Sequence, residues 1–306
     1  MHRTISISVP EHATGALLGG LERLEDVVGL SVQRGASVKP AGDLLTVHVL
    51  NRGADDVLRQ VRASGAAFSV VTSETTSIID SSEYRRVEHD VDEAVWEELE
   101  AGLRHQGRIT PNFLGLMAIG GVLAAIALTS EGSPQAIALI AAAIVAPGFE
   151  PIAKVALGLT LRRWNVVGRG LLSTLAGYAV FALTAGLALL LLRWLGGTTL
   201  ADFTGNSEVG RLGTPTAKEI ILSSAGALAG AVIMASYRRS VIAGALVALV
   251  VIPAAASVGM ALVSGRWGLA LQGFERFALD AALIVGWGVL VFALKQAFVH
   301  RRAPLV

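Results

Sequence analysis

The sequence contains no cysteine in its 306 residues, and only 16% of those residues are charged. The absence of cysteine excludes disulfide bonds, thiolate metal sites and cysteine nucleophiles. Basic and acidic residues nearly cancel, at 25 against 24, so no bulk positive charge indicates a nucleic-acid partner. The chain instead is rich in apolar sequence, with 53% hydrophobic residues and a mean hydropathy of +0.61. This composition predicts an integral membrane protein whose first partner is the lipid bilayer.

Sequence motifs for catalysis are missing as well. The chain has no Walker-type phosphate loop, no nucleophile elbow and no HExxH zinc motif. Four histidines of the N-terminal part, His12, His48, His89 and His105, are scattered without the spacing of metal ligands. We therefore expect no enzyme, no cofactor and no metal, and ATP-driven transport has no support within this chain.

Polarity changes abruptly along the chain. Residues 1–108 have the composition of a soluble domain, whereas nearly everything after Pro111 is apolar. The N-terminus begins with the strand-like segment TISISVP, so we expect no cleavable signal peptide. The first hydrophobic span should then act as the signal anchor and leave the N-terminal domain in the cytoplasm.

Residues 1–75 show the pattern of a small α+β domain. Ile5, Ile7 and Val9 alternate as in a half-buried strand, and residues 14–24 carry leucines at helical spacing. Strands are expected again over residues 28–32, 45–49 and 68–72, with a hairpin turn at Gly42-Asp43 and a second helix around residues 57–61. The order β-α-β-β-α-β is that of a ferredoxin-like domain. Ligand sensing, dimerisation and a purely structural role all remain open for it, because this fold does not name a function.

Residues 76–108 are expected to link the two parts. Residues 74–90 are polar and uneven, and an amphipathic helix of about 15 residues should follow, since Val91, Val95, Leu99 and Leu103 recur at helical spacing. This helix would lie on the cytoplasmic membrane surface or pack on the sheet. Arg104, His105 and Arg108 would then lie beside lipid headgroups.

Six hydrophobic spans are expected after the linker, over residues 111–128, 134–161, 166–192, 218–235, 241–263 and 269–294. As one helix the second stretch would be ~42 Å long, well beyond the ~30 Å hydrocarbon core. Its centre holds Pro147, Gly148 and Pro151, which predict two half-helices around an unwound segment. Pro253 should kink or break the fifth span in the same way.

The hydrophobic half contains two similar copies of one sequence pattern. One copy, in residues 109–197, begins at Thr110-Pro111 and contains VAPGFEPIAKVALGL and RRW; the other, in residues 214–306, begins at Thr214-Pro215 and contains VVIPAAASVGMALVSG and GRW. The period is ~104 residues, and three spans in each copy invert the second relative to the first. Residues 198–213 would form an extracytoplasmic loop. The fold class is therefore α+β: a ferredoxin-like domain followed by two inverted three-span repeats with broken helices.

The distribution of basic residues sets the orientation. One side of a six-span topology receives Arg104, Arg108, Arg162, Arg163, Arg238, Arg239, Lys295, Arg301 and Arg302, whereas the other receives Arg193, Arg211, Lys218 and Arg266. The positive-inside rule places both termini in the cytoplasm of a bacterial cell, with the chain in the inner membrane. We also expect a homo-oligomer.

Two segments resemble a known bacterial family. Ala146-Pro147-Gly148-Phe149-Glu150-Pro151-Ile152 is similar to the "iSPlm.Pi" segment of the domain of unknown function 389 (DUF389), and Ile252-Pro253-Ala254-Ala255-Ala256 with Gly259 is similar to a second segment of proline and small residues. The resemblance covers nearly all the chain and implies a ferredoxin-like domain followed by a hydrophobic domain. Glu150 departs from the family, where this residue is usually apolar, and the second segment has only one proline. The resemblance implies a fold and a membrane but no established reaction or substrate.

Glu150 is the sharpest candidate for chemistry. A carboxylate between two prolines in an apolar stretch is costly in lipid, so it should face a cavity or a partner. Lys154, four residues on, could pair with it across the first turn of the second half-helix. The pair could form a cation or proton site in which Glu150 changes protonation, or a structural ion pair that ties the break to other helices. Asp280, four residues after Arg276, either lines the pathway or forms a salt bridge at the helix end.

These residues lead to two alternative functions. The first is a secondary transporter or channel for a small solute or ion, with its site where the breaks of spans two and five meet and a regulatory or dimerising cytoplasmic domain. Its pathway would be formed by Pro147, Gly148, Glu150, Pro151, Lys154, Pro253 and Asp280. The second is a non-transporting membrane scaffold or sensor whose N-terminal domain binds a ligand or partner.

Overall fold

The computed structural model describes residues 2–66, 68–75, 78, 83–90, 95–236 and 241–298, with residues 84, 106 and 241–250 described by their backbone alone. The predicted helix start at Val91 and the basic residues Arg238, Arg239, Arg301 and Arg302 lie outside the described residues. The chain forms two compact units, the first reaching Glu97 and the second beginning at Glu98. Each unit is described by itself.

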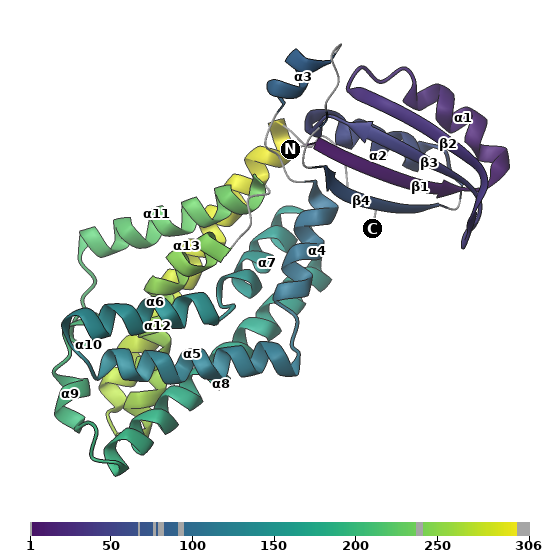
Figure 1. Ribbon diagram of the computed structural model, residues 1–306. Coiled ribbons are helices and arrows are strands. Elements are labelled where there is room, and N and C mark those ends of the chain that lie inside the picture. Colours follow the sequence, from purple (N-terminus) through teal and green to yellow (C-terminus); the bar gives the residue numbers. More distant parts are fainter. Residues whose placement is uncertain are drawn as a thin grey trace. The chain divides into compact units, whose positions relative to one another are not determined.

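The first unit is an antiparallel four-stranded sheet with two helices on one face (Figure 1). Its elements follow in the order β1 (His2–Val9), α1 (Glu11–Leu21), β2 (Val27–Val38), β3 (Ala41–Val49), the short 3-10 turn η1 (Asn51–Gly53), α2 (Ala54–Ala63) and β4 (Ser69–Thr75). The strands lie in the order β2-β3-β1-β4. Alternation places Ile5, Ile7 and Val9 on the covered face, where they pack with residues of both helices in one core. The predicted α+β character and element order are confirmed.

The hairpin between β2 and β3 turns at a different place from the predicted one. Val38 pairs with Ala41, so the turn is Lys39-Pro40 and the Gly42-Asp43 pair lies inside β3. Asp43 is buried and its carboxylate accepts hydrogen bonds from the Gly35 N–H at 2.8 Å and the Thr14 hydroxyl at 2.7 Å. These donors hold the pKa of the Asp43 carboxyl below its ordinary value. The Gly-Asp pair therefore fixes the irregular end of β2 instead of reversing the chain.

Two helices occupy the stretch predicted as a linker. These are α3 (Tyr84–Glu88), which the polar sequence did not predict, and α4 (Trp96–Gln106), which matches the C-terminal part of the predicted amphipathic helix. Val95 joins the core of the first unit, and Leu99 and Leu103 are buried in the second unit.

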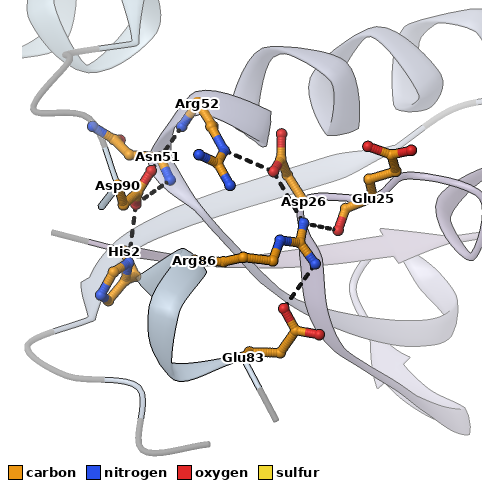
Figure 2. Close-up of polar contacts among 8 residues, drawn as sticks. All are labelled: His2, Glu25, Asp26, Asn51, Arg52, Glu83, Arg86 and Asp90. Atoms are coloured by element: carbon orange, nitrogen blue, oxygen red, sulfur yellow. Dashed lines mark hydrogen bonds and ion pairs between the residues drawn. The ribbon is translucent and has the colours of Figure 1, made fainter. Parts of the chain in front are cut away.

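A network of polar contacts holds the segment around α3 to the sheet domain (Figure 2). The Arg86 guanidinium contacts Asp26, just before β2, at 3.2 Å, and also donates to a backbone carbonyl nearby. The Asp90 side chain is buried and accepts a hydrogen bond from the Asn51 N–H at 2.6 Å while lying 3.0 Å from His2 Nδ1. The partners Asp26, Asn51 and His2 lie in three different parts of the fold. Their contacts therefore fix the place at which the chain leaves the domain.

The second unit is helical. It contains α5 (Pro111–Leu128), α6 (Gly132–Val145), α7 (Phe149–Thr160), α8 (Trp164–Trp194), α9 (Leu200–Thr204), α10 (Ser207–Arg211), α11 (Ala217–Ala235), α12 (Val241–Val263) and α13 (Trp267–Phe298). Of the described helices, α5, α8, α11 and α13 are long and apolar enough to cross a membrane, and the bent pair α6–α7 would make a fifth. In α12 the residues with described side chains form a shorter apolar helix, Val251–Val263. Several apolar helices thus indicate a membrane protein, while the count of six spans stays a prediction.

The helices of this unit bury small residues and expose large apolar ones. In α5, Gly120, Gly121 and Ala124 are buried, whereas Leu116 and Ile119 are exposed. Close contact through small residues and an apolar exterior are typical of helices that pack in lipid. Backbone approach is closest where glycines meet a neighbouring helix, as at Gly259 of α12 against α8.

Helix contacts fall into two similar groups. The first three segments pack as α5 on α6, α5 on α8 and α7 on α8, and the last three as α11 on α12, α11 on α13 and α12 on α13. Contacts of α12 with α6 and α8, and of α13 with α7, join the two groups. The predicted loop 198–213 holds the short helices α9 and α10.

Candidate functional site

The second hydrophobic stretch is interrupted at the place that its sequence predicts. Helix α6 ends at Val145, Ala146 is extended at φ −82° and ψ 117°, and α7 begins at Phe149, at an angle of 50° between the two helices. Pro147 supplies no N–H, and the Gly148 N–H turns back to the Ala146 carbonyl at 2.8 Å. The interruption thus places the start of α7 inside the unit.

Glu150 lies in the first turn of α7 and is 7% exposed. Its Oε2 atom has no hydrogen-bond partner among the described residues. A buried carboxylate oxygen without a partner is costly as an anion. Glu150 is therefore suited either to carry a proton or to hold a cation that neutralises it.

Tyr178 of α8 is a site residue that the sequence analysis missed. It is buried against the break, because a Cβ at Gly148 would collide with the Tyr178 hydroxyl. Its ring packs edge-on against Phe277 of α13, with centroids 4.7 Å apart. A lone tyrosine in the middle of an apolar span, next to a glycine, was the available signal. Glu150 and Asp280 both lie within electrostatic range of its hydroxyl.

Asp280 is the second buried carboxylate, at 2% exposed. Its Oδ2 accepts a hydrogen bond from Arg276 Nε at 2.9 Å, as the four-residue spacing predicted, while Oδ1 has no partner among the described residues. Arg276 also donates to the Ser223 hydroxyl of α11 at 3.1 Å and lies 3.8 Å from Glu219. The structure therefore brings Glu150 and Asp280 within electrostatic range of the same tyrosine, Tyr178.

Lys154 does not serve as the counter-charge of Glu150. The described residues form no ion pair between the two, and the charges that act on Lys154 are those of Arg169, Glu100 and Arg104. The Lys154 side chain instead lines a cavity of about 720 Å³ between α4, α7 and α8. The predicted pair does not form because the Lys154 side chain lines this cavity instead of contacting Glu150. Local spacing could not reveal the cavity.

Pro253 does not break the fifth stretch. Helix α12 continues from Val241 to Val263 with Pro253 inside it, since a single proline in a packed helix removes one hydrogen bond without ending the helix. The predicted meeting of two breaks is therefore wrong. Pro253 instead lines a second, smaller cavity of about 130 Å³ together with Glu208, Arg211, Glu219 and Arg276.

Metal binding has no visible site in this arrangement. Among the described residues no group of three or more His, Asp or Glu side chains could hold a metal ion.

Pro151 lies in the first turn of α7, and its carbonyl approaches Gly170 of α8, so its place is in helix packing.

Comparison with known proteins identifies one family. The model of the family described as "Domain of unknown function (DUF389)" matches residues 143–285, a little under half of the chain. No curated protein and no solved structure matches the chain. The matched segment runs from α6 into α13 and includes Glu150, Lys154, Tyr178 and Asp280. The resemblance read from the two proline segments is confirmed, since residues 143–285 match the model of the DUF389 family.

Proposed function

We propose that this protein is a multi-pass inner-membrane carrier for a small solute or ion, built from two inverted three-span repeats that work by alternating access. The first repeat would comprise α5, α6–α7 and α8, and the second α11, α12 and α13. The chemistry would be transport and not catalysis, and the protein would act as a homo-oligomer in the lipid bilayer.

Equivalent contacts within the two halves support the repeat. Gly170 of α8 lies under the carbonyl of Pro151, and Gly273 of α13 under the carbonyl of Ala254, with 3.0 Å to each oxygen from the position of an added Cβ. The same number of positions separates both members of each pair. It also separates Arg162 from Gly265, which both have a positive φ, at 53° and 69°, in the turn before the last helix of their half. A backbone turn and a glycine contact that recur at one spacing support a relation between the two halves.

Contacts between the halves follow the same spacing to within one position. Gly288 of α13 packs against Ala156 of α7, and Gly186 of α8 packs against Gly259 of α12. In each case the last helix of one half crosses the middle helix of the other. The spacing aligns Pro253 with Glu150, and not with Pro147 as the sequence comparison suggested. Glu150 on α7 and Pro253 on α12 would therefore hold equivalent positions, each on the middle helix of its half.

The observation that best supports this proposal is a pair of cavities of unequal size, lined by residues at the same spacing in the two halves. His105, Arg108 and Ser173 line the cavity of about 720 Å³, and the residues at the same spacing, Glu208, Arg211 and Arg276, line the cavity of about 130 Å³. In an inverted repeat, equivalent cavities open to opposite sides of the bilayer. The wide cavity would be the open side of a carrier. The narrow cavity, which the Arg276 ion pairs cross, would be its closed side.

The two carboxylates supply the ionisable groups that coupled transport needs. Glu150 lies one turn from Lys154 at the large cavity, and Asp280 lies one turn from Arg276 at the small cavity. Each has one oxygen without a partner among the described residues. Uptake and release of a proton or cation by these groups would accompany the exchange of open and closed cavities.

The N-terminal unit would be a cytoplasmic regulatory or dimerising domain. Its element order and its strand order β2-β3-β1-β4 support a ferredoxin-like fold. The excess of basic residues on one side of the six-span topology supports a cytoplasmic location for both termini.

Reciprocal labelling tests alternating access. Because the chain has no cysteine, Ser173→Cys reports on the large cavity and Leu212→Cys on the small one. In intact cells and inverted vesicles, a membrane-impermeant maleimide should label each position from one side only, and the sides should differ. Adding Arg276→Gln to each should raise labelling at Leu212→Cys and lower it at Ser173→Cys, since the network that closes the small cavity is lost.

The control is Arg193→Gln, which removes an exposed arginine that lines neither cavity. It should change neither reporter. A rise at Leu212→Cys without any fall at Ser173→Cys would mean local loosening only. That result would replace the carrier with the scaffold or sensor.

A further inference from the structure

We propose that the large cavity binds a phosphate-like oxyanion, so that the substrate class is anionic. Binding would hold without any transport, whereas the claim that the anion is carried rests on the proposed function. The cavity of about 720 Å³ is called the basic cavity here, because its lining includes the basic residues Arg104, His105, Arg108, Lys154 and Arg169.

Three separate parts of the chain bring these side chains together. Arg104 and His105 come from the last turn of α4, Lys154 from α7 and Arg169 from α8. None of the described residues that line the basic cavity is acidic. Gathering like charges around one hollow is unfavourable unless an anion or water balances them. The convergence therefore points to an anionic occupant.

Lys154 is the strongest single indication. Its side chain is 4% exposed and lines the basic cavity, and no described residue forms an ion pair or hydrogen bond with it. The acidic group that acts on it, Glu100, is already held by Arg163 at 2.7 Å. The Lys154 ammonium group thus reaches the cavity from a largely buried residue, and an anion in the cavity would give it a partner.

The lining chemistry suits an oxyanion. Arginine guanidinium groups bind phosphate and carboxylate oxygens in pairs, and lysine adds a point charge. The Ser173 hydroxyl, also on the lining, can donate a further hydrogen bond. A volume of about 720 Å³ falls in the range of small-molecule sites, about 300–1,000 Å³, so the cavity can hold a phosphate group with an organic remainder.

The oxyanion could belong to a free solute or to a lipid headgroup, because Ile109 and Leu172 line the same cavity with exposed apolar side chains. Two arms of one experiment separate these sources. The full-length protein is placed in nanodiscs of phosphatidylcholine alone, and inorganic phosphate is titrated in by calorimetry. In the second arm the nanodiscs contain phosphatidylglycerol, and lipid retained after detergent extraction is counted by native mass spectrometry.

Lys154→Gln should weaken phosphate binding, or phosphatidylglycerol retention, by at least about tenfold, the equivalent of one lost charge-assisted contact. Lys154→Arg should retain most of the binding, and Arg193→Gln should match the wild type. Phosphate binding that depends on Lys154 supports a free solute, and lipid retention that depends on Lys154 supports a headgroup.

Two results would overturn the proposal. One is a correctly folded wild type that binds neither probe; the other is an equal loss in Lys154→Gln and Arg193→Gln, which would mean unspecific attraction. Melting temperatures of the variants establish folding, and removal of an unpaired buried charge should not lower them. Phosphate binding with no reciprocal labelling would retain the anion site and reject the carrier, and the converse would retain the carrier alone.

Discussion

At Gly259 the backbone of α12 lies directly against the backbone of α8, so one added methyl group should force the two helices apart. A Cβ built at this position would overlap the carbonyl group of Ala182 and lie 3.0 Å from its Cα. The obstacle is backbone, which cannot rotate away as a side chain would. Gly259→Ala should therefore strain the crossing by about 1–3 kcal/mol, the usual cost of overpacking a filled interior.

A matched variant removes the effect of helix propensity from this estimate. Gly286 in α13 has no atom within 4 Å of an added Cβ, so Gly286→Ala gains the same propensity of up to about 1 kcal/mol without strain. The difference in unfolding free energy between the two variants is then the strain alone. Equilibrium unfolding in mixed micelles with increasing dodecyl sulfate, followed by circular dichroism, measures it. Equal stability of Gly259→Ala and Gly286→Ala would refute the close crossing of α8 and α12.

Three further predictions concern the repeat, the sheet and a helix end. Gly170→Ala and Gly273→Ala should both lower the melting temperature because an added Cβ would lie 3.0 Å from a carbonyl oxygen and also press on a side chain, Val155 in the first case and Ser257 in the second; a loss at one alone would count against the repeat. The Asp43 pKa is lowered mainly by the Gly35 N–H, so the stabilisation is complete above the ordinary value of 3.8 and is lost as the pH falls through the lower folded value. Hydrogen exchange of β2 and β3 in the full chain should quicken in that acid range, and should already be fast in Asp43→Asn at neutral pH. Thr216 caps α11 by accepting a hydrogen bond from the Glu219 N–H at 3.3 Å, so Thr216→Ala should cost about 1 kcal/mol in the same unfolding assay, and no change would contradict the cap.

Together the two proposals couple an anion to an ionisable carboxylate. Helix α7 carries Lys154 at the basic cavity and Glu150 one turn before it, at the break beside Tyr178. A change of charge at Glu150 would therefore be felt by the same short helix that helps to bind the anion. A short helix joined to α6 by an extended residue can tilt more easily than a continuous span, which gives the coupling a physical route.

Local sequence was enough to define the elements whose ends carry their own signals. The first span was predicted at residues 111–128 and found as Pro111–Leu128, because Thr110 caps it, Pro111 suits its first turn and polar residues follow it. The interruption of the second stretch was predicted from Pro147, Gly148 and Pro151, whose effects on the backbone act within one turn. The strand alternation of the N-terminal unit was equally local.

Sequence spacing misled wherever a distant residue decided the outcome. Gly42-Asp43 has the composition of a turn, but three donors brought together by the fold hold the Asp43 carboxylate inside a strand. Pro253 was expected to kink or break its helix, yet α12, which packs on neighbouring helices, continues past it. The family resemblance located the region of the break, and the structure gave the side chains around it.

By itself, therefore, the sequence determined the membrane class, the order of elements, the broken second stretch and the presence of a buried carboxylate at the break. These depend on composition, periodicity and backbone chemistry over a few residues. Only the tertiary structure decided that Lys154 belongs to a basic cavity and not to Glu150, and that Tyr178 lies within electrostatic range of both Glu150 and Asp280. Which charges share a cavity depends on helices far apart in the chain, and no local spacing records that.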